Sequence, residues 1–119
     1  MPTAHDFRRI ALGMKDAVEG AHMGHPDFRV NGRIFATLHT DNKFGMVKLT
    51  PDQQREFVKA HARIFAPESG AWGRAGCTRV VLQAVDDEDV LGEAITLAWQ
   101  NASAGPAATR SKRRRAESP

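Results

Sequence analysis

The amino-acid sequence predicts a single α+β domain in which three helices pack against a largely antiparallel four-stranded sheet, in the order α-β-β-β-α-β-α. Apolar residues recur at helical spacing in three segments, and four shorter segments have the composition of strands. The first three predicted strands follow one another through short turns, which join antiparallel neighbours and favour an α+β fold. A length of 119 residues with 41% hydrophobic and 26% charged side chains suits one such domain.

The first helix is predicted from a capping box and an apolar stripe. Thr3 stands three residues before Asp6, the spacing at which the two residues cap a helix N-terminus. The apolar residues that follow at helical spacing are Phe7, Ile10, Ala11, Met14 and Val18. Gly20, Gly24 and Pro26 are expected to end this helix and to form a loop.

The strands are predicted from β-branched and aromatic residues. Segments 28–30 and 33–38 are expected to form a hairpin, because Asn31-Gly32 between them is typical of a type I′ turn. Two further strands are expected over 44–49 and 78–83.

The second helix is predicted to begin after Thr50, with Pro51 at its first position and Gln53 as the capping partner. Apolar residues at helical spacing continue to Phe65, and Pro67 should stop the helix.

A glycine-rich loop is expected over 68–76. The third helix, with apolar residues from Val90 to Trp99, is expected to be capped by Asp86 and Asp89.

The positive charge is concentrated at the C-terminus. Residues 103–119 hold five basic side chains and one acidic one, whereas residues 1–102 hold twelve basic and thirteen acidic ones. The tail has no apolar side chain larger than alanine, so it cannot offset the entropy cost of ordering its backbone. The sequence therefore predicts a domain over 1–102 and a disordered basic tail over 103–119.

A cytoplasmic protein without a membrane partner is expected. Cys77 is the single cysteine, so no internal disulfide can form, and the first residues contain no apolar signal-peptide core. No stretch approaches the roughly 20 apolar residues that a membrane-spanning helix needs.

Several motifs together resemble the MmcQ/YjbR-like family of small proteins. They lie at 21–38, from Ala21-His22-Met23-Gly24-His25-Pro26 through the hairpin, at 48–54, at 70–78 and at Ala98-Trp99. The resemblance covers about residues 7–99 and excludes the tail. It implies an α+β fold and a role in DNA binding.

The basic residues of the predicted strands are the candidate DNA contacts. These strands contain four cations and no acid, and a fifth cation lies in the glycine-rich loop. The candidates are Arg29, Arg33, Lys48, Arg74 and Arg79. Phosphate contacts require only cations at the surface, so the sequence predicts a non-enzymatic DNA-binding protein whose tail and Lys43 add salt-sensitive affinity. The alternative is that these cations are solvated or paired with acids of the helices.

The same hairpin also favours a protein-interaction or homodimerisation module. Arg29 is expected to pair with Ile34 across the type I′ turn, so both side chains would share one face of the sheet. If Phe28 and Phe35 face the core, the open face holds Ile34, Ala36 and Leu38, which is an apolar surface that a second copy could cover.

No cofactor, metal or enzymatic activity is expected. His22 and His25 are separated by two residues, but Cys77 and His39 complete no recognised ligand spacing. No Gly-x-Ser-x-Gly motif is present, and the loop over 70–76 follows a helix, whereas a phosphate-binding nucleotide loop follows a strand.

Overall fold

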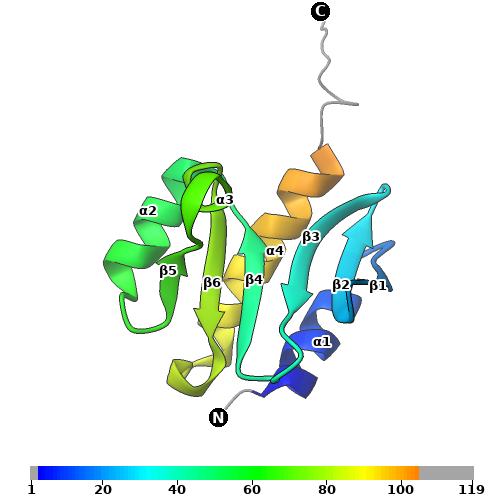
Figure 1. Cartoon of the computed structure of the whole chain (residues 1–119), viewed down its shortest axis with the longest axis horizontal. Helices are drawn as coiled ribbons and strands as arrows, with labels where there is room; N and C mark the ends of the chain where they lie inside the picture. Colours follow the sequence, from blue (N-terminus) through cyan, green and yellow to red (C-terminus); the bar gives the residue numbers. More distant parts are fainter. Residues whose placement is uncertain (1–2, 105–119) are drawn as a thin grey trace, which may run out of the picture.

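The computed structural model describes residues 3–104, which form a six-stranded antiparallel sheet, four α-helices and one turn of 3₁₀ helix (Figure 1). In chain order the elements are α1 (Ala4–Leu12), β1 (Val18–His22), β2 (His25–Val30), β3 (Arg33–Leu38), β4 (Phe44–Lys48), α2 (Pro51–Ala60), β5 (Phe65–Pro67), α3 (Gly70–Arg74), β6 (Cys77–Val81), η1 (Leu82–Ala84) and α4 (Glu88–Ala104).

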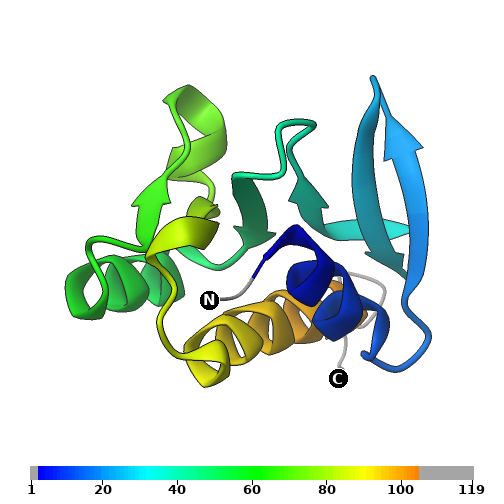
Figure 2. The ribbon, with the colours of Figure 1, turned by 90° about the horizontal axis from the view of Figure 1, so that it is seen from below.

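The sheet has the strand order β1-β2-β3-β4-β6-β5, and every neighbouring pair is antiparallel. Helices α1, α2 and α4 lie on one side of it, whereas the β1–β2 hairpin and α3 rise on the other side (Figure 2). We call this second side the open face. The predicted α+β class with an antiparallel sheet is confirmed, but the described residues contain two more strands and one more α-helix than the sequence predicted.

The first missed strand is β1, because the predicted helix ends early. Helix α1 has the predicted Thr3 capping box but stops at Leu12, with Gly13 as its C-cap. The chain then turns through Asp16, whose φ of 62° is incompatible with a continuing right-handed helix. Val18, predicted to be helical, begins β1 instead, and Gly20 lies within that strand.

The second missed strand is β5. Helix α2 begins with the predicted Thr50 capping box but ends at Ala60, because His61 has the non-helical φ and ψ of −140° and 61°. Phe65, predicted to be helical, instead pairs with Val80 at the edge of the sheet. The predicted loop over 68–76 contains the short helix α3.

The last helix is longer than predicted and has a different cap. The Asp87 carboxylate accepts a hydrogen bond from the Asp89 backbone N–H at 2.9 Å, so Asp87 caps α4 in place of Asp86 or Asp89. Helix α4 continues to Ala104, two residues beyond the predicted boundary at residue 102. Residues 105–119 of the predicted disordered tail lie outside the described residues.

The hydrophobic core lies between the sheet and the three larger helices. Phe7 of α1 packs against Phe28 of β2 with ring centroids 6.1 Å apart, and Phe57 of α2 meets Phe65 of β5 at 5.1 Å. A Cβ atom on Gly45 of β4 would lie 2.6 Å from the Phe7 ring, so this glycine lets α1 approach the sheet closely.

An irregularity in the β2–β3 hairpin moves the predicted apolar surface into the core. The type I′ turn and the pairing of Arg29 with Ile34 are as predicted, with positive φ at both turn residues. The register shifts after this pair, so that Phe28 faces Ala36 and Phe35 is an extra residue in β3. Ala36 and Leu38 are therefore fully buried beneath the helices, and the prediction that they lie on the open face is wrong.

Candidate functional site

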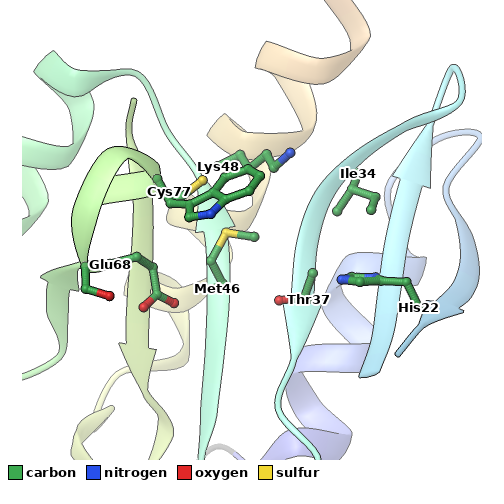
Figure 3. A pocket seen from close by; sticks show the side chains of 9 residues that line it. His22, Ile34, Thr37, Met46, Lys48, Glu68 and Cys77 are labelled. Atoms are coloured by element: carbon green, nitrogen blue, oxygen red, sulfur yellow. The ribbon is translucent and has the colours of Figure 1, made fainter. Parts of the chain in front are cut away.

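The open face holds a cavity of about 320 Å³ that extends from the β1–β2 hairpin to α3. The residues that line it are His22, Ile34, Thr37, Met46, Lys48, Glu68, Ser69, Trp72 and Cys77. Figure 3 shows the His22 imidazole pointing from β1 toward Thr37 on β3, with Met46 on the next strand and Glu68 beyond it. Met46 and Lys48 share this side of the sheet because they are two apart on β4. Ile34 and Thr37 are three apart on β3 and share it because of the irregularity at Phe35.

A buried carboxylate supports one wall of this cavity. The Asp27 side chain is fully buried on the open face, where it accepts hydrogen bonds from Arg29 Nε at 2.7 Å and Arg29 Nη2 at 3.0 Å. Its second oxygen lies 2.8 Å from His22 Nδ1. The hydrogen bonds from Arg29 hold the pKa of Asp27 below its usual value. An ionised carboxylate can only accept, so His22 Nδ1 carries the proton in this bond.

Gly20 makes room for this cluster. A Cβ atom at Gly20 would lie 2.9 Å from Asp27 Oδ1 and 3.3 Å from Arg29 Nε. Strand β1 can therefore close over the ion pair only because residue 20 has no side chain.

The sheet was predicted to contain cations and no acidic residues, and the structure differs from this prediction. Strand β2 begins at His25, three residues earlier than predicted, and thus includes Asp27. The missed strand β1 brings Glu19, which pairs with Arg8 of α1 at 3.0 Å. The expectation of a sheet without acids is wrong, because both acids lie in strand segments that were predicted to be helix or loop.

Arg79, on strand β6 beside the edge strand β5, also faces a carboxylate. Its Nε lies 3.5 Å from Glu68 Oε1, which is close enough for an ion pair, although this Nε donates no hydrogen bond to any described residue. The Arg79 guanidinium lies 5.8 Å from the centre of the Phe44 ring. Arg79 and Arg29 are thus both partly neutralised, and a phosphate would compete with their carboxylates.

The other three candidate cations, Arg33, Lys48 and Arg74, make no ion pair within residues 3–104. Arg33 and Arg74 are exposed, and Lys48 is half-buried. Arg33 and Lys48 line one hollow together with Ala75, the neighbour of Arg74. Arg33 and Lys48 thus share one end of the molecule, and Arg74 precedes a residue that borders the same hollow; we call the end that these three residues mark the basic end.

The basic end forms where β3 and β4 separate (Figure 1). Their pairing covers only Ala36 to Leu38 of β3, so the first residues of β3 diverge from Lys48 at the end of β4. The backbone of Lys48 is fixed there, because its carbonyl accepts a hydrogen bond from Asn101 Nδ2 of α4 at 3.2 Å.

The C-terminal end of α4 lies at the same end of the molecule. The Asn31 side chain in the β2–β3 turn donates to the Ser103 carbonyl at 3.2 Å. In the sequence, the first basic residue after Ala104 is Arg110. The acidic segment 86–89 lies around the other end of the seventeen-residue α4, about 25 Å away at 1.5 Å per residue.

Three histidines lie near one another at this side of the sheet. The His25 ring centre is 6.2 Å from that of His22 and 6.0 Å from that of His39. Among residues 3–104, no group of three or more His, Cys, Asp or Glu residues could hold a metal ion. Cys77 is buried, and this burial raises the pKa of its thiol above the usual value.

Sequence reasoning missed three residues of this site: Asp27, Glu68 and Trp72. Trp72 is 69% exposed on α3. The spacing of Asp27 and Arg29, two residues apart in one strand, was the available signal for their pairing. Glu68 and Trp72 had no such signal, because the segment 68–76 that holds both was predicted to be a loop.

These observations define a small α+β protein with one face of its antiparallel sheet covered by helices and the other face open and hollowed. The family model YjbR matches residues 12–101, and the chain belongs to the YjbR family, as its motifs indicated. The fold is similar to that of the crystal structure of Deinococcus radiodurans protein DR2400, which is assigned the family-model domain DUF419. The TM-score is 0.70 at 20% identity, over 83% of this chain and 77% of that one. No curated protein matches the chain. No helix within the described residues is long and apolar enough to cross a membrane.

Proposed function

We propose that this chain is a non-enzymatic DNA-binding protein that contacts the phosphate backbone with Arg33, Lys48 and Arg74. The observation that carries the proposal is that Arg33 and Lys48 line one hollow, which Ala75 next to Arg74 also borders, and that none of the three cations has an ion-pair partner among the described residues. Arg29 and Arg79 remain predicted phosphate contacts. Each already pairs with a carboxylate and would have to exchange it for a phosphate.

The distribution of charge supports an oriented approach to DNA. Cations at one end of α4 and the acidic segment 86–89 at the other give the domain a polarity that would turn the basic end toward a polyanion. Phosphate contacts position a protein on DNA without reading its sequence, so weak sequence preference is expected.

The test measures how DNA affinity depends on salt. Fluorescence anisotropy with a labelled duplex gives the slope of log affinity against log salt for the full chain and for the variant Arg33→Ala/Lys48→Ala/Arg74→Ala. Each lost phosphate contact should reduce the magnitude of the slope by about 0.9, so the triple variant should lose about 2.7.

A matched control removes the same number of charges elsewhere. Lys15, Lys59 and Arg63 are exposed and make no ion pair within the described part of the chain. The variant Lys15→Ala/Lys59→Ala/Arg63→Ala should keep the slope nearly unchanged. Equal slopes for the two triple variants would refute the assignment of the basic end.

A chain that ends at Ala104 separates the domain from the tail. If the domain binds DNA, the shortened chain should retain the part of the slope that depends on Arg33, Lys48 and Arg74. Complete loss of binding would mean that the tail alone binds DNA. The alternative of homodimerisation through Ile34, Ala36 and Leu38 lacks its surface, because the last two residues are in the core.

A further inference from the structure

The cavity on the open face has the size and lining of a site for a single planar ring. Its volume of about 320 Å³ is at the small end of the range for ligand pockets. Ile34 and Met46 contribute apolar surface from the strands, and Trp72 contributes an aromatic side chain from α3. With 69% of its surface exposed, the Trp72 indole gains little from folding and is free to stack on a ligand.

Helix α3 is held in place by buried hydrogen bonds. The buried Gln54 side chain donates to the Gly73 carbonyl at 3.0 Å and to the Cys77 carbonyl at 3.1 Å. A Cβ atom at Gly73 would lie 1.7 Å from the Glu68 carbonyl oxygen, so this glycine allows α3 to pack tightly on the preceding chain. The backbone of Trp72 is thereby fixed before any ligand arrives, which reduces the entropy cost of binding.

Polar groups stand around the apolar lining. The His22 imidazole is 45% exposed and held by the buried Asp27, so its second ring nitrogen is available to a ligand. Glu68 contributes a carboxylate that can accept from an amine or imide N–H. Lys48 lines both this cavity and the hollow at the basic end. A ligand with a planar, hydrogen-bonding ring and an attached phosphate fits these groups.

We propose that the cavity binds one unpaired nucleotide of single-stranded DNA, with its base against Trp72 and its phosphate at Lys48. This inference rests on the proposed function and adds a preference for unpaired strands. In a duplex each base is already stacked and paired, and the free energy needed to extract it would offset the free energy gained by binding it in the cavity. In a single strand the base is free to stack on an aromatic side chain. The strand would then continue from Lys48 toward Arg33 and Arg74.

The experiment compares single and double strands by fluorescence anisotropy. Labelled oligothymidylate and its duplex with oligodeoxyadenylate are titrated with the full chain and with Trp72→Ala. The variant should bind the single strand about 5- to 150-fold more weakly, which corresponds to the loss of one stacked base. Duplex affinity should change by less than about twofold, a difference that corresponds to only about 0.4 kcal/mol.

Two further variants separate stacking from a general loss of structure. Trp72→Phe keeps an aromatic ring and should retain most of the single-strand affinity. Trp99→Phe removes an indole that lies outside the cavity and donates to the Lys15 carbonyl, and it should bind as the unmodified chain does. Equal weakening by Trp72→Phe and Trp72→Ala would overturn the stacking role.

Tryptophan emission identifies the occupant. In the Trp99→Phe background, Trp72 is the single tryptophan, and oligothymidylate should quench its emission. Thymidine monophosphate should also quench it with lower affinity, whereas inorganic phosphate should not. Quenching by the mononucleotide without quenching by the strand would overturn the proposal, as would a change in emission with protein concentration alone, which would indicate a second copy in the cavity.

Failure of this inference can be distinguished from failure of the proposed function. If Trp72→Ala binds single and double strands as the unmodified chain does, while the salt slope still depends on the basic end, the nucleotide site is refuted and DNA binding stands. If the slope does not depend on the basic end, the proposed function itself is refuted.

Discussion

Replacing Asp27 with asparagine should destabilise the domain by about 2–3 kcal/mol at pH 7. The buried carboxylate accepts hydrogen bonds of 2.7, 3.0 and 2.8 Å from Arg29 and His22. Removal of one partner from a fully buried ion pair costs about 3–5 kcal/mol. We expect the lower cost of about 2–3 kcal/mol here because the Arg29 and His22 side chains are 37% and 45% exposed, so water can partly replace the lost carboxylate.

The effect of Asp27→Asn should depend on pH with a defined sign. Hydrogen bonds from Arg29 lower the pKa of the Asp27 carboxyl in the folded state relative to about 3.9 in the unfolded chain. The carboxylate therefore contributes its full stability above about pH 5 and loses it as the pH falls through the folded-state value. Urea unfolding at a series of pH values should show the two proteins converging in acid.

The matched control is Asp52→Asn, which removes an exposed carboxylate that pairs with Arg55 on the surface of α2. This change should cost less than about 1 kcal/mol. The reasoning would be refuted if Asp27→Asn were as stable as the unmodified chain at pH 7, or if its deficit stayed constant down to pH 3.

Further predictions concern two glycines and the cysteine. Gly76→Ala should lower the free energy of unfolding by more than about 2 kcal/mol, because residue 76 has a φ of +112° and its Cβ would lie 1.9 Å from the Leu49 carbonyl oxygen. Gly92→Ala on α4, where nothing lies within 4 Å, should instead raise it by about 0.5–1 kcal/mol, and equal thermal denaturation curves would contradict both expectations. Burial raises the pKa of the Cys77 thiol, so iodoacetamide at pH 8 should modify the folded chain far more slowly than the chain in urea, and equal rates would show that the thiol is accessible.

The elements with strong local signals were predictable from the sequence. The two capping boxes at Thr3 and Thr50 form as predicted, because each needs only residues that are three positions apart. The Asn31-Gly32 turn also depends on its own two residues and forms as predicted.

The missed strands depend on contacts between distant segments. Val18 continues the apolar stripe of α1, so its place in β1 follows only from pairing with Arg29 of β2. Phe65 likewise has helical spacing, and its strand exists because Val80 lies beside it in the sheet. Local periodicity cannot detect such pairing, which arises from tertiary structure.

The candidate site was predictable only in part. The five cations were identified by type, but which of them are neutralised depends on register. Asp27 reaches Arg29 because both lie in β2, and Glu68 reaches Arg79 because β5 packs beside β6. The hairpin irregularity that buries Ala36 also has no sequence signal, because Phe35 and Ala36 are both ordinary strand residues.

The opposite placement of Thr3 and Ala104, the first and last described residues, matters for how fusions to this protein should be built. Helix α1 lies at the acidic end of α4, where Arg9 contacts Glu88 at 2.7 Å, whereas Ala104 lies beside the Asn31 turn (Figure 1). An affinity tag or reporter attached before Thr3 would project away from Arg33 and Lys48. The same module attached directly after Ala104 would crowd them, so surface immobilisation through the amino terminus should preserve access for a nucleic acid.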